Sequence, residues 1–296
     1  MIKLLIEAES EQVGRRIDQV LADAFPELSR TEIQQEIRAG KVTISGEAID
    51  RPAHRVRVGN CIQWEIPNKP LLRPQNIPLD ILYEDPFMVV INKSSGIVVH
   101  PGAGTEATTL VEGLLVDREL PVSDDPARPG IVHRLDMETS GVIAVAKNLV
   151  ALEALKQQFA YRVTKKHYIA VANGCFDETE GHIDAPIGRN PAMPQRMSIQ
   201  SGGRPAQTNF NVLAEQDGTS LLWVRPRTGR THQIRVHLQY TGHPVVGDEK
   251  YGGVSADRLM LHAWRLLIRH PMHGALMEFR APIPESFPSF GYDKLD

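Results

Sequence analysis

Residues 131–146 read Ile-Val-His-Arg-Leu-Asp-Met-Glu-Thr-Ser-Gly-Val-Ile-Ala-Val-Ala, a loop rich in ionisable side chains that leads into an apolar run. Asp136 directly follows an apolar residue and stands two positions after Arg134. A carboxylate in this setting can be buried and kept ionised by a guanidinium, as a nucleophile or a base requires. Residues 139–141 have the composition of a turn, and residues 142–146 that of a fully buried strand. The stretch therefore predicts a reactive carboxylate at the mouth of a core strand.

A simpler interpretation of this Arg-x-Asp pair is an exposed ion pair, which is usually worth well under about 1 kcal/mol. The surroundings of Asp136 argue against it. A carboxylate beside a glycine turn, at the end of a buried strand, is placed for chemistry rather than for solvation. We therefore expect Asp136 to belong to the active site of an enzyme.

Composition restricts the class of protein. The 296 residues are 42% hydrophobic and 23% charged, as in a globular protein long enough for two domains. The sequence has no run of 18 apolar residues, and its first residues turn acidic too early for a signal peptide. We expect a cytoplasmic monomer. Cys61 and Cys175 lie far apart and outside any CxxC spacing, so we expect buried small side chains rather than a disulfide or a zinc site.

The charge is distributed unevenly. A formal net charge of -3 argues against a protein that coats nucleic acid through its overall charge. Residues 225–247, however, contain four arginines and no acidic residue. If the protein binds RNA, local basic stretches of this kind must make the contacts.

The first 67 residues predict a small domain of helices and strands. Apolar positions recur with a helical period over residues 12–28, and Ser29 with Glu32 has the spacing of a capping box that opens a second helix ending near Gly40. Residues 41–45 and 61–66 alternate apolar and polar side chains, as strands do. This order, with Leu28-Ser-Arg-Thr31 and Ile37-Arg-Ala-Gly-Lys-Val42, resembles the small RNA-binding domain first seen in a ribosomal protein, also called the alpha-L motif.

The charge of this segment supports an RNA-binding face less clearly than its pattern does. Residues 1–67 carry nine basic and eleven acidic side chains, but residues 38–60 carry five basic and two acidic ones. We expect Arg38 and Lys41 to be among its phosphate contacts. The alternative is a small domain with no role in RNA binding.

The rest of the chain predicts a second domain. Residues 68–79 have a proline-rich linker composition, so we place the RNA-binding domain at 1–67 and the second domain at 80–296. Strands outnumber helices there and do not alternate regularly with them, which favours an α+β fold with a mixed sheet. The predicted helices cover residues 109–120 and 149–161, and the predicted strands cover 81–83, 87–91, 142–146, 167–172, 208–213, 221–225, 261–268 and 276–279.

Five segments of the second domain together resemble the RluA family of RNA pseudouridine synthases, and within it the RluD-type enzymes that modify large-subunit ribosomal RNA. The resemblance implies the pseudouridine synthase fold, with a mixed and largely antiparallel sheet. Its segments are the His133-Arg-Leu-Asp136 loop, Val89-Val-Ile-Asn-Lys-Ser-Ser-Gly96 with His100-Pro-Gly-Ala-Gly104, Lys165-Lys-His-Tyr-Ile-Ala-Val-Ala-Asn-Gly174, Pro226-Arg-Thr-Gly-Arg-Thr-His-Gln-Ile-Arg-Val-His-Leu238 with residues 242–252, and Leu261-His-Ala263 with Ala281-Pro-Ile-Pro284.

This resemblance implies three catalytic side chains. Asp136 would act as the nucleophile or as the base that removes a ribose proton, and the resemblance does not choose between these routes. Tyr168 would offer an aromatic face and a phenol to a uracil flipped out of the RNA. Arg235 would pair with the catalytic carboxylate through a bidentate contact. Without the motif, Tyr168 would be a core aromatic and Arg235 a solvated arginine.

The same resemblance implies RNA contacts around the site. Arg134 would fill the gap left by the extruded nucleotide, Arg230 would meet a phosphate, and His133 would join them. Two positions depart from the family pattern, Ser94 in place of a common proline and Met137 in place of a common basic residue. Neither change removes a catalytic group.

No cofactor or metal is expected. Gly102-Ala-Gly104 lacks the Gly-Lys-Ser/Thr ending of a phosphate loop, and His232 and His237 are five residues apart rather than four. Isomerisation of uridine needs neither redox chemistry nor ATP. Three rival functions remain: a transfer RNA pseudouridine synthase, a catalytically silent RNA-binding assembly factor, and a glycoside hydrolase. The last needs paired carboxylates, whereas Glu138 is only a neighbour of Asp136 on the same turn.

Overall fold

The computed structural model divides into two compact units. The first is Met1–Leu72 with Val122–Pro129, and the second is Arg73–Pro121 with Gly130–Asp296. The predicted domain limits stay a prediction, and residues 68–71 of the predicted linker lie outside the described residues. The structure describes residues 2–7, 10–25, 28, 30–66, 72–102, 107–123 and 125–290.

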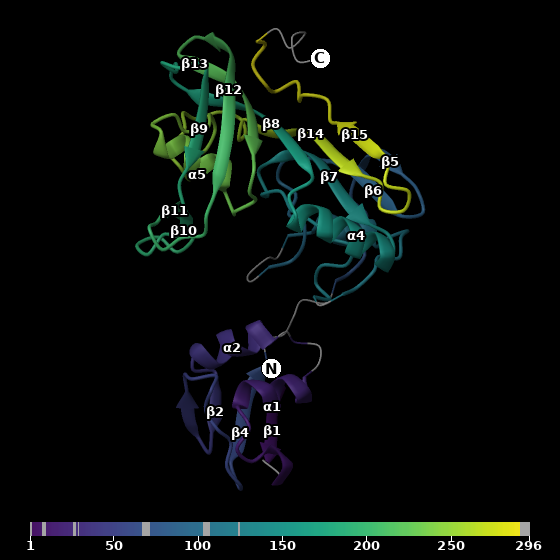
Figure 1. The fold of residues 1–296 in the computed structure, drawn as a ribbon, viewed down its shortest axis with the longest axis vertical. Helices are drawn as coiled ribbons and strands as arrows, with labels where there is room; N and C mark the ends of the chain where they lie inside the picture. Colours follow the sequence, from purple (N-terminus) through teal and green to yellow (C-terminus); the bar gives the residue numbers. More distant parts are fainter. Residues whose placement is uncertain are drawn as a thin grey trace. The chain divides into compact units, whose positions relative to one another are not determined.

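The N-terminal unit packs two helices and a four-stranded antiparallel sheet around one core (Figure 1). Its sheet has the order β1-β4-β2-β3. Ile17 and Leu21 of the first helix and Ile33 of the second are fully buried in the same cluster as Trp64. The elements are β1 (Ile2–Glu7), α1 (Ile17–Ala24), α2 (Arg30–Arg38), β2 (Val42–Ile44), β3 (Glu47–Ile49) and β4 (Cys61–Ile66), with a short 3-10 helix at Ser10–Gln12.

The sequence predicted both helices of this unit, but the first is shorter than expected. It begins at Ile17 rather than near residue 12, because the 3-10 helix and a turn at Gly14 precede it. Ser29, the predicted cap of the second helix, lies outside the described residues. The strands β1 and β3 were not predicted.

The second unit is built on one nine-stranded, mostly antiparallel sheet, so the α+β prediction is confirmed. The strand order is β5-β6-β7-β14-β8-β13-β12-β9, with β15 paired to β14, and only the pair of β7 and β14 is parallel. The strands are β5 (Asp80–Glu84), β6 (Met88–Lys93), β7 (Ser140–Ala146), β8 (Lys165–Asn173), β9 (Glu180–Asp184), β12 (Gln207–Gln216), β13 (Thr219–Pro226), β14 (Leu261–Arg269) and β15 (Leu276–Arg280), and β10 (Ile187–Arg189) and β11 (Met197–Ile199) form a separate pair.

Three helices accompany this sheet: α3 (Leu110–Leu114), α4 (Leu149–Ala160) and α5 (Gln233–Tyr240). Figure 1 shows α4 beside β7, whereas α5 lies with β12 and β13 in the other half of the sheet. The helix predicted at 109–120 ends at Leu114, and α4 agrees with the prediction to within one residue.

The central strand β7 is buried along its whole length, as the sequence predicted. Ile143 and Val145 face the larger core, while Val142 and Ala144 face the cluster that contains Leu152 of α4. Burial on both faces explains why the strand is a continuous apolar run rather than an alternating one. The loop that carries Asp136 therefore ends on one of the most rigidly packed strands of the unit.

The prediction that both cysteines are buried is wrong. Cys175 is exposed and Cys61 is half-buried, because Cys175 follows the turn at Gly174 instead of lying in β8. Both thiols are free. Among the residues that the structure describes, no helix is long and apolar enough to cross a membrane.

Candidate active site

Asp136 lies at a pocket of about 400 Å³ in the second unit. The pocket wall combines the Asp136 loop, the end of α4, the start of β8 and the turn between β13 and α5. Three sequence-predicted catalytic residues, Asp136, Tyr168 and Arg235, line this one pocket although they are 32 and 67 residues apart along the chain. Arg134 and Arg230 line it as well.

The backbone after Asp136 is fixed by the turn that follows β6. Lys93 is almost completely buried, and its Nζ donates to the carbonyl oxygens of Ser94 (2.9 Å), Ile97 (2.8 Å) and Met137 (3.0 Å). Burial lowers the pKa of Lys93 to about 7, although the charges of Asp136 and Glu138 oppose this shift. The ammonium thus joins two segments 44 residues apart.

Two further hydrogen bonds hold the same loop. The backbone N–H of Gly96 donates to the Met137 carbonyl at 2.9 Å, and Ser95 Oγ donates to the Glu138 carbonyl at 2.6 Å. Lys93 lies in the motif of residues 89–96, but its role in holding the Asp136 loop was not predicted. The sequence did contain a signal for this role, because Lys93 is the last residue of an apolar strand. A lysine buried at such a position needs hydrogen-bond acceptors around its ammonium.

Arg235 lies beside Asp136 but does not form the predicted bidentate contact with it. Its Nη1 is 3.9 Å from Asp136 Oδ2, beyond hydrogen-bond distance, and 3.2 Å from Glu138 Oε2. The bidentate contact is made instead with Asp248, where Nε and Nη2 donate at 2.7 and 2.8 Å. Asp248 lies in the motif of residues 242–252, but its pairing with Arg235 was not predicted. The two residues are 13 positions apart, and only the tertiary fold brings them together.

The pair of Arg235 and Asp248 is deeply buried. The Arg235 side chain is 3% exposed and the Asp248 side chain is fully covered. Asp248 also accepts the backbone N–H of Tyr251 at 3.2 Å. With its fork fixed in this way, Arg235 can direct its remaining Nη1 at Asp136 and Glu138.

Tyr168 lies on β8, opposite Val224 of β13, and is 9% exposed. Burial and then the negative charge of Asp136 raise the pKa of Tyr168 above its usual value. The phenol therefore stays protonated at neutral pH and can donate a hydrogen bond or a proton. This is the chemistry expected of an active-site tyrosine beside a carboxylate.

His133 lines the same pocket, and its ring is held by contacts with β7 and α4. Its Nε2 accepts the backbone N–H of Ala144 at 2.9 Å, and its ring stacks on Phe159 with centroids 4.4 Å apart. Burial and then the charge of Lys166 lower the pKa of His133 to about 3. A neutral ring that is bound to β7 and α4 positions the Asp136 loop and offers no positive charge to a phosphate.

The predicted RNA-binding residues fall into two groups. Arg134 is exposed at the pocket, and Arg230 is half-buried there, with Nε donating to the Pro205 carbonyl at 3.1 Å. Arg38 and Lys41 belong to the N-terminal unit, where both are exposed and Lys41 pairs with Glu36 at 3.1 Å.

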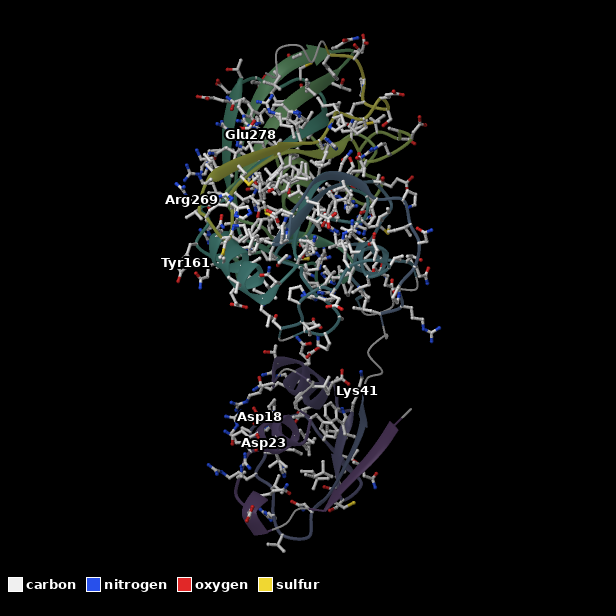
Figure 2. The ribbon with its side chains drawn as sticks, turned by 90° about the vertical axis from the view of Figure 1, so that its right-hand side faces the viewer. Asp18, Asp23, Lys41, Tyr161, Arg269 and Glu278 are labelled. Atoms are coloured by element: carbon white, nitrogen blue, oxygen red, sulfur yellow. The ribbon has the colours of Figure 1, made fainter. Side chains whose placement is uncertain are left out.

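A buried carboxylate organises the basic side chains of the N-terminal unit. Asp18 on α1, labelled in Figure 2, accepts hydrogen bonds from Arg16, Arg30 and Gln34 at 2.7 to 3.1 Å. Burial raises the pKa of Asp18, but these hydrogen bonds outweigh it and lower the pKa below its usual value. The sequence analysis did not single out Asp18.

Comparison with known proteins identifies the fold and the chemistry. Residues 87–240 match the RNA pseudouridylate synthase family, and residues 15–60 match the S4 domain. The chain belongs to the RNA pseudouridylate synthase family. It is 39% identical to ribosomal large subunit pseudouridine synthase D of Escherichia coli (strain K12), over 96% of this chain and 92% of that protein. It is also 39% identical to the uncharacterized RNA pseudouridine synthase YlyB of Bacillus subtilis, over 96% of each chain.

Solved structures agree with this pseudouridine synthase fold. Human RNA pseudouridylate synthase domain containing 1 is 32% identical, with a TM-score of 0.57 over 69% of this chain and 83% of that one. The enzyme is therefore an isomerase that acts on RNA, with an S4 domain at its N-terminal end. Within the described part of the chain, no group of three or more His, Cys, Asp or Glu side chains could hold a metal ion.

Proposed function

We propose that this pseudouridine synthase modifies uridines of large-subunit ribosomal RNA, with Asp136 as its catalytic residue. Similarity to relatives named for the large ribosomal subunit, over nearly the whole of each chain, supports the substrate. One observation supports the site above all others: Asp136, Tyr168 and Arg235 line a single pocket. Ribosomal RNA as substrate would place the enzyme in the cytoplasm.

The reaction breaks the bond between N1 of uracil and C1′ of ribose, turns the base, and joins its C5 to C1′. The proton on C5 is lost, and N1 regains a proton. Asp136 starts the reaction either by attacking C1′ or by removing the proton from C2′. In both routes Arg235 supplies a fixed positive charge beside the carboxylate, because Asp248 holds its fork.

The other pocket residues hold the base and the RNA. The ring of Tyr168 packs against the uracil. Its protonated phenol can take part in the proton transfers at C5 and N1 that follow the cleavage of the bond to ribose. Arg134, exposed at the pocket, stacks in the space that the extruded nucleotide leaves. In the S4 domain, the exposed Arg38 and Lys41 contact phosphates of the same RNA.

Pseudouridine mapping tests this proposal. Pseudouridines are mapped in ribosomal and transfer RNA from cells with the gene, without it, and with an Asp136→Asn copy. We expect one or more pseudouridines of large-subunit ribosomal RNA to disappear without the gene and to stay absent with Asp136→Asn. Loss from transfer RNA alone would show that the substrate is wrong, and recovery with Asp136→Asn would show that the catalytic residue is wrong.

A further inference from the structure

The wall of the Asp136 pocket carries a large excess of positive charge. Its lining includes one carboxylate, Asp136, and six cationic side chains. Arg235 is neutralised by Asp248, but in the described part of the chain the other five form no ion pair with a carboxylate. These five are Arg134, Arg162, Lys166, Arg227 and Arg230. Unpaired charges gathered in a cleft favour an anionic ligand.

Three of these cations are close enough to repel one another. Burial and then the charges of Arg230 and Arg162 lower the pKa of Lys166 to about 8. Burial and then the charges of Arg204 and Arg162 also lower the pKa of Arg230. Mutual repulsion of this kind disfavours the charged forms until an anion binds between them.

The Lys166 ammonium makes only one hydrogen bond with the residues that the structure describes. Nζ donates to the Thr228 carbonyl at 3.4 Å, a weak contact, and has no other partner among the described residues. The turn at Gly229 comes close to this ammonium, since a Cβ added at Gly229 would lie 3.4 Å from Nζ. An ammonium has three N–H donors, so Lys166 can still donate to a ligand in the pocket.

Arg162 lies at the end of α4, directly after Tyr161, which Figure 2 labels. Its backbone has a φ of 58°, the left-handed region that usually holds glycine at the end of a helix. Its side chain is exposed and lines the pocket. A strained backbone conformation at an arginine suggests that its guanidinium binds a ligand.

We propose that Arg162, Lys166 and Arg230 bind a backbone phosphate that adjoins the target uridine. The site rests on the proposed function of the Asp136 pocket and adds a second anchor to it. A phosphodiester shares one negative charge between two non-bridging oxygens, and each of them can accept hydrogen bonds from ammonium and guanidinium donors. Holding this phosphate would add binding energy beside the extruded nucleotide in both the ground state and the transition state, so it would strengthen RNA binding more than it would raise kcat.

Salt titration provides the first test, with a short RNA that carries the mapped uridine. Binding and turnover are measured for the full-length protein, for Lys166→Met and for the control Lys165→Met. Lys165 is the adjacent residue of β8, is exposed and does not line the pocket. Tritium release from 5-³H-uridine reports turnover, because C5 loses its proton in the reaction.

We expect Lys166→Met to weaken RNA binding about tenfold or more. The plot of log K for binding against log salt concentration should become shallower by about 0.7 to 0.9, which corresponds to the loss of one phosphate contact. The value of kcat should change little, and Lys165→Met should match the wild type. A slope unchanged in Lys166→Met, an equal change in Lys165→Met, or a loss confined to kcat would overturn the proposal. If Lys166→Met does not fold, Arg162→Met at the exposed position carries the same test.

Neutral linkages in the RNA locate the phosphate. A methylphosphonate replaces the phosphate on either side of the target uridine, and each RNA is bound to the wild type and to Lys166→Met. At one of the two linkages the substitution should weaken binding of the wild type more than binding of Lys166→Met, in which only Arg162 and Arg230 still contact the phosphate. Additive losses at both linkages would overturn the phosphate site while wild-type turnover still supports the proposed function. Absence of wild-type turnover would instead reject the proposed function.

Discussion

Replacement of Asp248 by asparagine tests how the active-site arginine is held. The carboxylate binds Nε and Nη2 of Arg235 at 2.7 and 2.8 Å, with both side chains buried. Asparagine has nearly the same shape but turns an N–H group toward one of these donors. One charge-assisted hydrogen bond is lost, and Arg235 loses its main negative partner.

The expected magnitude follows from the burial of this pair. Removing one partner of a buried ion pair costs about 3 to 5 kcal/mol. Asparagine keeps one hydrogen bond, and Glu138 remains 3.2 Å from Nη1, so we expect a loss near the lower end, about 3 kcal/mol. We also expect Arg235 to shift toward Glu138 and Asp136, and kcat to fall at least about tenfold, or roughly 1.4 kcal/mol of transition-state stabilisation.

Urea unfolding and tritium release measure the two effects. The control is Asp184→Asn, an exposed carboxylate that accepts one hydrogen bond from Gln207 at 2.8 Å, whose stability should stay within about 0.5 kcal/mol of the wild type. If Asp248→Asn is as stable as this control, the buried pair does not contribute as argued. If it is less stable but has normal kcat, Asp248 stabilises the fold without positioning Arg235.

Four further changes have defined outcomes. Arg162→Gly should raise the free energy of unfolding by up to about 1 kcal/mol, because the backbone is left-handed there, while RNA binding weakens in the same variant. Lys93→Met should lower kcat with RNA affinity retained, because the Met137 carbonyl beside Asp136 loses one of its two donors and keeps only the Gly96 N–H; equal kcat would contradict this. Burial lowers the pKa of His133 from 6.5 to about 3 in the folded protein. Between pH 6.5 and pH 3, His133 is therefore protonated in the unfolded chain but not in the folded one. The folded state loses stability as the pH falls from 6.5 toward 3. His133→Asn, which keeps an acceptor for Ala144 N–H, should lose less over the same acid titration by circular dichroism. Deleting residues 1–67 should leave the catalytic unit folded and make the salt dependence of RNA binding shallower; identical slopes would show that this segment does not bind the RNA.

Local patterns predicted the elements that depend on local chemistry. The buried run of β7 and the apolar positions of α4 were located to within two residues, because each pattern records how an element meets the core. The helix predicted at 109–120 was too long, because α3 ends at Leu114 although apolar side chains continue after it. The short strands β9, β10 and β11 were missed because three to five residues carry too little periodicity.

In the candidate site, too, the sequence predicted some residues but not the contacts that hold them. Motif resemblance brought Asp136, Tyr168 and Arg235 together, but it did not reveal what holds them. The bidentate partner of Arg235 is Asp248, and the support of the Asp136 loop comes from Lys93. These contacts join segments that only the folded sheet brings side by side, so no local pattern in the sequence specifies them.

The most direct measurement of the central claim is tritium release by purified Asp136→Asn on the RNA that the wild type modifies. The amide keeps the shape of the side chain but can neither attack C1′ nor remove a proton. We predict activity below about a thousandth of the wild type, with RNA affinity within about tenfold, or roughly 1.4 kcal/mol. Turnover by the folded variant above about a thousandth of the wild-type rate would contradict the assignment of Asp136 as the catalytic residue.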